Sequence, residues 1–365
     1  MAAALQDIYL QTLERCRPEK LVHVPDDAPR DVVAIGKCAA ALFRGVRDYR
    51  DALVIVPEGY PRVDDVECID GGHPDLTPAS FAAGKRLLEF VEQHDDILFL
   101  ISGGGSACVE WPLPGYTQDQ LTKINHDLVA SGRPIGEINA ERRKYSAIKG
   151  GRLGARVRGR CMALIYSDVS TGRLADVASG PVTRNMQLIA DNHTLVKTAA
   201  SVIPSVVEGP GGTGGAPHTH TGPSTTLGMT TVWDEQIECD VQTAAEQLAK
   251  AARNLKKGEV LVAGGEPTVE HKGDGKGGRC CELAARFALQ EINDVEALFG
   301  SSDGVDGNSG IAAALLPPNP PVDRHKIESE LRNANSLAVV EMLGRAIMIP
   351  PTGNNLRDLV LLARA

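Results

Sequence analysis

The sequence predicts an α/β fold in two domains, and three observations support this prediction. Short apolar runs typical of buried strands alternate with amphipathic stretches typical of helices along most of the chain. Several of the apolar runs end in glycine-rich turns, as strands do when their carboxyl ends face a ligand. The length of 365 residues exceeds what one ordinary core holds, so two domains are the default.

The N-terminal half is expected to form a Rossmann-like parallel sheet with helices on both faces, because strand and helix patterns follow one another in turn. Residues 1–17 predict an amphipathic helix and lack the continuous apolar core of a signal peptide. Further helices are expected over 77–93 and 117–132. The predicted strands cover residues 31–36, 52–56, 66–70, 97–101 and 161–166.

The apolar run at 97–101 leads directly into a glycine loop, which is residues 102–107 with the sequence Ser-Gly-Gly-Gly-Ser-Ala. Glycine lets the backbone take positive φ and lets a ligand approach the main chain closely. Successive N–H groups in such a turn form an anion-binding nest, to which the two hydroxyls add donors. The loop therefore predicts a phosphate-binding site, with a tight turn that binds nothing as the alternative.

Cations stand beside glycines at two further places in this half. Lys37 follows a strand and a glycine, where a lysine suits a phosphate, although a lone lysine is more often solvated. Residues 141–160, which include Lys149 and Gly150, form a dense basic run in a chain of net charge −9. The run indicates a polyanionic ligand such as a nucleotide triphosphate, unless it is only a solvated helix face.

Two positions after the strand at 161–166 complete the predicted site of this half. Asp168 comes at the carboxyl end of that strand, where a carboxylate is a usual Mg²⁺ ligand in phosphoryl-transfer sites. Gly180 lies in a tight Ser-Gly-Pro turn that brings the backbone close to a ligand. Both positions fit an anionic substrate held with a metal ion.

The C-terminal half begins after residues 203–228, which are rich in Gly, Pro, Thr and Ser and indicate a flexible insert. Residues 273–278 match G-x-G-x-x-G, but polar residues precede them where a dinucleotide fingerprint needs a buried strand. Arg279 follows at a helix start and suits bidentate recognition of a phosphate or carboxylate. Strands are expected at 230–233, 259–263, 298–302, 346–349 and 359–362, and helices at 241–255 and 281–289.

Composition excludes several classes of protein. No apolar stretch approaches the roughly 18 residues of a membrane span. The net charge of −9 argues against a general nucleic-acid binder. Eight scattered cysteines without a C-x-x-C pair favour a reducing cytoplasm as the location.

In this order, the motifs resemble the glycerate 2-kinase family, whose members carry a MOFRL-type C-terminal domain and are often labelled hydroxypyruvate reductases. The resemblance spans nearly the whole chain. The motifs that carry it are Gly36-Lys37, Gly71-Gly72-His73-Pro74, Ser102 to Ala107, Glu137-Ile138-Asn139, Ile148 to Leu153, Ser167-Asp168-Val169, Ser179-Gly180-Pro181, Gly264-Gly265-Glu266, Gly277-Gly278-Arg279 with Glu282, Asp303 to Gly307 and Pro351 to Asn355.

The resemblance implies an ATP- and Mg²⁺-dependent kinase that phosphorylates the 2-hydroxyl of D-glycerate, or of a closely related hydroxy acid, to give 2-phosphoglycerate. It also implies two α/β domains facing each other across an active-site cleft, the C-terminal one being the smaller domain and containing a mixed sheet. The predicted domains are residues 1–202 and 229–365, separated by the insert at 203–228.

The resemblance also assigns roles to individual residues. The family's catalytic lysine and arginine fall on Lys37 and Arg279, and Mg²⁺ is expected at Asp168 and Glu266. Nucleotide contacts are expected at Ser102, Gly103, Gly104, Gly105, Ser106, Lys149, Gly150 and Gly180. Substrate contacts are expected at Arg143, Gly278, Glu282, Asp303 and Asp306.

The chain also departs from the family pattern. The acidic residues expected after Asp168 and after Pro181 are absent, and Cys280-Cys281 replaces the Asn-Gln pair expected after Arg279. Two other functions therefore stay open: an NAD(P)-dependent hydroxypyruvate reductase, and a relative that binds nucleotide or metabolite with little or no catalysis. The expected partners are a small hydroxy acid and a nucleotide, with neither nucleic acid nor membrane, and a homodimer is left open.

Overall fold

The computed structural model describes residues 2–133, 135–170, 172–208, 229–270 and 273–364. The chain forms two compact units. The continuous unit is Arg17–Asp191, and the split unit joins Met1–Cys16 to Asn192–Ala365. This division differs from the boundaries predicted at 202 and 229. Most of the predicted insert, residues 209–228, lies outside the described residues, and its predicted start at 203 falls within a helix.

The continuous unit is built on a parallel sheet that has six strands within the described residues. The strands lie in the order β3-β2-β1-β4-β5-β6, which is a dinucleotide-binding Rossmann order. Strands β1, β4 and β5 consist mainly of apolar residues and are buried along their whole length, because helices cover both faces of a parallel sheet. The predicted Rossmann-like sheet is confirmed. The strands are β1 (Asp31–Ile35), β2 (Asp51–Pro57), β3 (Glu67–Gly71), β4 (Ile97–Ser102), β5 (Cys161–Tyr166) and β6 (Met186–Ala190).

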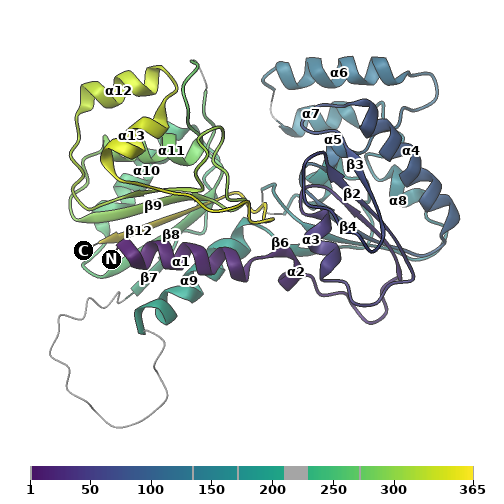
Figure 1. The fold of residues 1–365 in the computed structure, drawn as a ribbon, viewed down its shortest axis with the longest axis horizontal. Helices are drawn as coiled ribbons and strands as arrows, with labels where there is room; N and C mark the ends of the chain where they lie inside the picture. Colours follow the sequence, from purple (N-terminus) through teal and green to yellow (C-terminus); the bar gives the residue numbers. More distant parts are fainter. Residues whose placement is uncertain (1, 134, 171, 209–228, 271–272, 365) are drawn as a thin grey trace, which may run out of the picture. The chain divides into compact units, whose positions relative to one another are not determined.

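Helices connect these strands (Figure 1). The longest begins as predicted, because Pro78 occupies its first turn and the Ser80 hydroxyl accepts a hydrogen bond from the Thr77 amide at 3.0 Å. The helices are α2 (Pro18–Leu21), α3 (Ala39–Arg44), α4 (Pro78–Gln93), α5 (Gly105–Cys108), α6 (Gln118–Ala130), α7 (Ile135–Arg142), α8 (Arg152–Arg156) and the 3-10 helix η1 (Leu174–Ser179).

The strand order of this sheet reverses between β1 and β4. The chain first builds outward from β1 to β3 and then returns to place β4 on the other side of β1. In open α/β sheets, ligands bind outside the carboxyl ends of the two strands at such a topological switch point. Here those two ends carry Lys37 and the glycine loop (residues 102–107).

The split unit contains a mixed sheet in the order β11-β10-β9-β12-β8-β7. Its central strand β12 runs antiparallel to both β8 and β9, whereas β7 and β8 are parallel. The predicted mixed sheet is therefore confirmed, and within the described residues both sheets have six strands. The strands are β7 (Met229–Val232), β8 (Glu259–Gly265), β9 (Val295–Ser301), β10 (Ala313–Leu316), β11 (Arg345–Ile347) and β12 (Asp358–Arg364).

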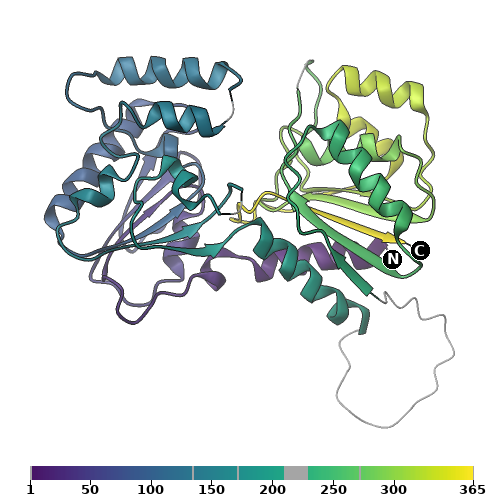
Figure 2. The same ribbon diagram turned by 180° about the vertical axis from the view of Figure 1, so that it is seen from behind.

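Helices cover the two faces of this second sheet in different sets. Helices α1 and α9 lie side by side on one face in both views (Figures 1 and 2), and the other face packs against α10, α11 and α13. Asp240 caps α10 by accepting hydrogen bonds from the Gln242 and Thr243 amides. The helices are α1 (Ala2–Arg15), α9 (Asn192–Glu208), α10 (Val241–Asn254), α11 (Arg279–Ala288), α12 (Arg324–Arg332) and α13 (Ser336–Leu343).

Helix α1 belongs to the split unit, which is the physical reason for the changed domain boundary. Its apolar residues Leu5, Ile8 and Tyr9 are fully buried. The Tyr9 hydroxyl donates to the carbonyl oxygen of Ser301 at 2.6 Å, at the end of β9. The first and last segments of the chain thus share one core.

Two strands, β6 and β10, were not predicted. β6 is an edge strand with Gln187 and Leu188 exposed, so its sequence shows neither a continuous apolar run nor clean alternation. β10 has only four residues, all of them buried and apolar, and so short an apolar run cannot be told from a buried helix segment by its pattern. Among the described residues, no helix is both long and apolar enough to cross a bilayer.

Candidate active site

Two turns meet at the carboxyl ends of β1 and β4. The Lys37 amide donates to the Gly103 carbonyl oxygen at 2.8 Å, and the Cys38 amide donates to the Ser102 hydroxyl at 3.0 Å. Gly36 has a φ of 112°, and a Cβ there would lie 2.6 Å from the carbonyl oxygens of Ser102 and Gly103. Only glycine permits this close approach, so the two turns hold each other in place.

Lys37 and His73 both lie close to Gly104 of the glycine loop. A Cβ on Gly104, whose φ is 81°, would lie 2.9 Å from Cγ of Lys37 and 3.2 Å from Cδ2 of His73. Lys37 is half-buried and forms no ion pair within the described part of the chain. Burial, and then the charge of Lys37, lower the pKa of His73 to about 4, so this imidazole is neutral at neutral pH. An uncompensated ammonium group beside a glycine backbone suits a phosphate.

A cluster of polar side chains continues from the loop. The hydroxyl oxygens of Ser106 and Ser179 lie 2.7 Å apart, and Ser179 donates to Oδ1 of Asn139 at 2.9 Å. Nη1 of Arg142 lies 3.4 Å from the Ser106 hydroxyl. Ser106 was predicted as a nucleotide contact, whereas Arg142, Asn139 and Ser179 were not assigned to the site.

Gly150 and Gly180 lie next to Ser179 of this cluster, Gly180 in sequence and Gly150 through a backbone hydrogen bond. Gly180 has a φ of 67°, and a Cβ there would lie 2.3 Å from the Ala175 carbonyl oxygen. Gly150 has a φ of 65°, and its amide donates to the Ser179 carbonyl oxygen at 3.2 Å. Both glycines therefore shape the turn that holds Ser179 against the glycine loop.

Lys149 and Arg143 differ from their predicted roles. The Lys149 ammonium group is buried in an ion pair with Glu110 at 2.5 Å, and burial lowers the pKa of Lys149. Arg143 pairs with Asp176 at 2.6 Å and donates to the Ser179 carbonyl oxygen at 3.1 Å. Each cation is paired with a carboxylate of its own unit, and Lys149 is also fully buried, so its ammonium group has no exposed surface to offer a nucleotide.

The two predicted metal ligands lie in different units. Asp168 follows β5, whose carboxyl end is next to that of β4 in the sheet, and its side chain is half-buried. Glu266 follows β8, and its two oxygens pair with Arg279 at 2.7 Å and Arg357 at 3.3 Å. Glu266 therefore does not fit as a magnesium ligand. Within the described ranges, no group of three His, Cys, Asp or Glu side chains is arranged to hold a metal ion.

Arg279 begins α11 and is held by two carboxylates. Its Nε and Nη2 donate to the two oxygens of Asp358 at 3.0 and 3.3 Å, and Nη1 pairs with Glu266 at 2.7 Å. Burial raises the pKa of Asp358 to about 6, although Arg279 opposes this shift. The Arg279 side chain is still 36% exposed, so the carboxylates orient it without enclosing it. Asp358 was missed because its only signal is a lone acid before an apolar run.

Two predicted substrate contacts have structural partners in the split unit. Both oxygens of Asp306 accept hydrogen bonds, from the amides of Cys280 and Cys281 at 2.9 Å each, so Asp306 caps α11. Glu282 pairs with Arg286 one turn later in the same helix, at 2.7 Å. Both carboxylates therefore have partners within their own unit, whereas the sequence predicted that they contact the substrate.

Gly278 and Asp303 support the same region. A Cβ on Gly278 would lie 2.2 Å from Oδ1 of Asp306, so the glycine leaves room for the cap. Oδ1 of Asp303 accepts hydrogen bonds from the Ser301 hydroxyl at 2.7 Å and the Val305 amide at 2.9 Å. Asp303 thereby orders the turn after β9.

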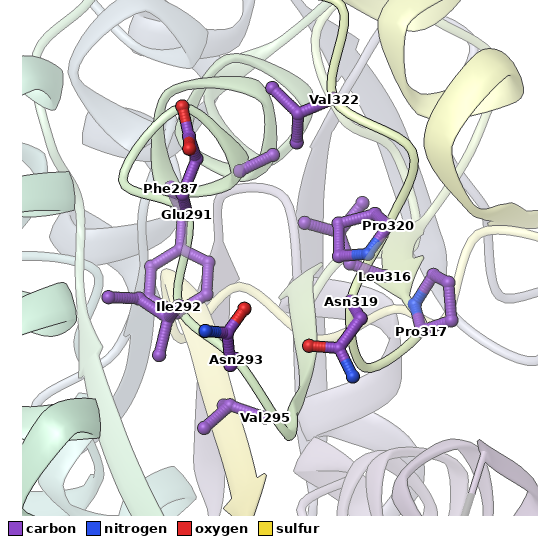
Figure 3. A pocket seen from close by; sticks show the side chains of 11 residues that line it. Phe287, Glu291, Ile292, Asn293, Val295, Leu316, Pro317, Asn319, Pro320 and Val322 are labelled. Carbon is purple, nitrogen blue, oxygen red and sulfur yellow. The ribbon is translucent and has the colours of Figure 1, made fainter.

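A separate pocket of about 270 Å³ lies elsewhere in the split unit (Figure 3). It lies where β9 begins at Val295, whereas Asp358 pairs with Ser301 at the opposite end of β9. Its one charged lining residue, Glu291, already pairs with Arg324 at 2.8 Å. The pocket offers no cation to an anionic substrate. The lining residues are Phe287, Ala288, Glu291, Ile292, Asn293, Val295, Leu316, Pro317, Asn319, Pro320 and Val322.

Known proteins resemble this chain along nearly its whole length. Residues 4–208 match the family described as a domain of unknown function (DUF4147), and residues 259–358 match the MOFRL family. The chain is 29% identical to the D-glycerate 2-kinase of Thermotoga maritima over 377 residues, which cover 90% of this chain and 89% of that protein. It is 29% identical to the glycerate 2-kinase of Sulfurisphaera tokodaii over 387 residues, covering 93% and 91%.

A solved structure agrees with these matches. The crystal structure of a glycerate kinase from Thermotoga maritima superposes with a TM-score of 0.82 at 25% identity and covers 100% of this chain and 99% of that one. The resemblance and fold class predicted from the sequence are thereby confirmed, as is the prediction of a kinase. The chain belongs to the DUF4147 family, carries a MOFRL region after it, and is a kinase.

Proposed function

We propose that the protein transfers the γ-phosphoryl group of ATP to the 2-hydroxyl of D-glycerate, giving 2-phosphoglycerate and ADP. The observation that carries the proposal is the pairing of Lys37 with the glycine loop at the switch point between β1 and β4. The choice of glycerate is supported by the names of the relatives that match most of the chain.

The residues of the site suit phosphoryl transfer, which demands mainly positioning and positive charge. In the proposed reaction, an oxygen of the hydroxy acid attacks the γ-phosphorus, the bond to the β–γ bridging oxygen breaks, and the hydroxyl proton passes to solvent. The glycine loop holds phosphate oxygens, while the Lys37 ammonium group offsets the charge on the transferred group. Arg279 is proposed as the second cation, oriented by Asp358 and Glu266.

Mg²⁺ is proposed to accompany the nucleotide, where it would neutralise phosphate charge. Mg²⁺ at such sites usually takes one or two carboxylates together with phosphate oxygens and water. Asp168, at the end of β5 next to the glycine loop strand, fits this requirement. Glu266 is not proposed as a ligand, because both of its oxygens are paired with arginines.

The first turn of the sheet argues against the NAD(P)-dependent reductase. In dinucleotide-binding sheets of this strand order, the G-x-G-x-x-G fingerprint follows the first strand. Here β1 is followed by Gly36, Lys37 and Cys38, with no second glycine at the required spacing. The G-x-G-x-x-G match at 273–278 comes seven residues after the end of β8 and therefore has the wrong context.

A coupled ADP-release assay with Mg·ATP and a panel of small hydroxy acids, D-glycerate first, tests the proposal. We expect release that depends on D-glycerate, with 2-phosphoglycerate identified as the product by ³¹P NMR. In parallel, NADH and NADPH oxidation with hydroxypyruvate is measured and is expected to be absent. ATP binding without release for any acid would instead favour a relative that binds its ligands without catalysis.

A further inference from the structure

Arg142 is the cation of the polar cluster, and it has only neutral partners. It is the last residue of α7 and is half-buried. Nε donates to Oδ1 of Asn125 at 2.8 Å, and Nη1 makes long contacts of 3.4 Å with Ser106 and Asn139. In the described residues, no carboxylate lies within ion-pair distance of Arg142, and no acceptor is bonded to its Nη2.

The neighbouring Arg143 shows that this lack of a carboxylate is specific to Arg142. Arg143 is paired with Asp176 and holds two carbonyl oxygens of η1, those of Ala175 and Ser179. Burial lowers the pKa of Arg142, although the charges of Glu110 and Asp75, neither of them within ion-pair distance, oppose this shift. A buried cation without a counter-ion is costly unless a ligand supplies the negative charge.

The turn that faces Arg142 has an unusual backbone. Ala178, Ser179 and Gly180 have φ values of 53°, 61° and 67°, so three successive residues are left-handed, and two of them are not glycine. The side chains at 178 and 179 are buried. Such strain persists only where surrounding contacts impose it, and it clusters at ligand sites. Here it places the Ser179 hydroxyl against Ser106 of the glycine loop.

Two donors of this cluster, Nη2 of Arg142 and Nδ2 of Asn125, have no acceptor within the described residues, whereas the two hydroxyl hydrogens are already used. The Ser179 hydroxyl donates to Oδ1 of Asn139, so the Ser106 hydroxyl must donate to Ser179, and Arg142 also reaches that same Asn139 oxygen. The amide nitrogen of Asn125 is buried without a partner in the described chain. A donor-rich cluster around an uncompensated guanidinium is complementary to an oxyanion.

We infer that Arg142, through the Nη2 donor that has no acceptor within the described residues, binds an oxyanion of one substrate beside the glycine loop. The inference rests on the proposed function for the identity of the two substrates. Both candidate ligands would present a pair of negatively charged oxygens to the guanidinium, from a carboxylate or from a phosphate. The carboxylate would come from the hydroxy acid and the phosphate from the nucleotide, and the experiment separates these sources.

The test compares Arg142→Gln and Arg142→Lys with Arg158→Gln. Arg158 is a matched control, because it is an exposed arginine of the same unit that pairs with Asp95 at 2.7 Å, outside the cluster. Calorimetry measures the Kd of D-glycerate and of Mg·ADP separately, and steady-state assays give KM for each substrate. We expect Arg142→Gln to raise Kd and KM about tenfold or more for one of the two ligands, with Arg142→Lys intermediate.

The identity of the affected ligand reports the source of the oxyanion. A loss confined to D-glycerate assigns the carboxylate, and a loss confined to Mg·ADP assigns a phosphate. Ser179→Ala is the second variant, because it removes the hydroxyl that links Ser106 to Asn139 while leaving Arg142 and its Asn125 contact in place. Circular dichroism and thermal melting check that each variant is folded.

Two results would overturn the inference. One is a Kd within about twofold of wild type for both ligands in folded Arg142→Gln, and the other is an equal loss in Arg158→Gln. Because calorimetry needs no turnover, wild-type protein that binds both ligands without phosphorylating glycerate would contradict the proposed function alone. The comparison at Arg142 would still be decided by the binding data.

Discussion

Lys37 and Arg279 differ in how their charges are compensated. Lys37 has no ion-pair partner among the described residues, whereas Arg279 is held by Asp358 and Glu266. In the proposed reaction both stabilise charge on the transferred group, and losing one such donor typically costs two to three orders of magnitude. We expect Lys37→Ala and Arg279→Ala each to lower turnover by at least about a hundredfold in the ADP-release assay, with the fold intact.

Lys85 supplies a control for the lysine variant. It is an exposed lysine of α4 in the same unit, and its ion pair with Glu89 is loose at 3.9 Å. Lys85→Ala should retain wild-type turnover. Near wild-type turnover in Lys37→Ala or Arg279→Ala would show that the site has been assigned to the wrong residues.

His73 gives the protein a pH-dependent stability. Its pKa is about 4 in the folded chain, mainly because of burial, against an ordinary value of 6.5. Between these values the unfolded chain binds more protons, so the free energy of unfolding falls as the pH is lowered from 6.5 to 4. We expect His73→Gln to reduce this slope, measured by urea denaturation at several pH values from 4 to 7.

The exposed His126 provides the comparison for that measurement, because its side chain is 76% exposed. His126→Gln should leave the slope unchanged. A slope in His73→Gln identical to that of wild type would mean that His73 titrates alike in the folded and unfolded chains.

Some residues of the candidate site could be predicted from the sequence, and others could not. Glycines after a predicted strand indicate a tight turn without reference to any distant residue. The glycine loop and Lys37 could therefore each be predicted from the few residues around them. Arg142 and Asp358 act through partners distant in sequence, 36 residues away for Ser106 and 79 for Arg279. Lys149 shows the reverse problem, because its charge was visible in the sequence and its buried partner Glu110 was not.

At the scale of elements, α11 depends on its cap. The two hydrogen bonds from the Cys280 and Cys281 amides to Asp306 satisfy groups that would otherwise be buried without partners. We expect Asp306→Ala to lower the free energy of unfolding by about 1–2 kcal/mol, the usual cost of losing a cap. Thermal and urea denaturation measure this loss.

Asp323 tests whether Asp306 acts only as a cap. Asp323 caps α12, where it accepts a hydrogen bond from the Lys326 amide at 3.2 Å, and it was not predicted as a substrate contact. Asp323→Ala should also lower stability, with no change in the KM for D-glycerate. If Asp306→Ala raises that KM and keeps wild-type stability, the substrate role predicted for Asp306 would be restored.

The elements that could be predicted are those buried on both faces. β1, β4 and β5 consist of nearly continuous apolar runs, which predicted their positions. The glycines in the turns after β1 and β4 predicted where those two strands end. β6 and β10 lacked such signals, the first because it is a half-exposed edge and the second because it is short. The sequence could not predict which unit α1 joins, because the pattern of an amphipathic helix does not show which sheet its apolar face covers.

At the scale of the whole molecule, the two ends of the chain stabilise the same unit. Helix α1 covers one face of the second sheet, and Nδ2 of Asn354 donates to the Leu13 carbonyl oxygen at 3.0 Å. We expect deletion of residues 1–16 to lower amide protection across residues 192–364. The continuous unit should keep its protection, because its sheet lacks no element.

Hydrogen exchange with mass spectrometry measures both regions in one sample. Tyr9→Phe is a milder variant that removes only the hydroxyl bonded to the Ser301 carbonyl oxygen, and it should lower protection near β9 by a smaller amount. Equal loss of protection in both units after the deletion would mean that α1 supports the continuous unit as well.

The position of β12 at the centre of the second sheet also orders events at the ribosome. The continuous unit is complete long before β12, residues 358–364, is translated. Units generally fold as they emerge during synthesis. Helix α1 is translated well before α9, β9 and β12, the elements that cover its apolar face. A chain truncated within β12 would carry a complete first sheet and an incomplete second sheet, and we expect proteases to degrade it.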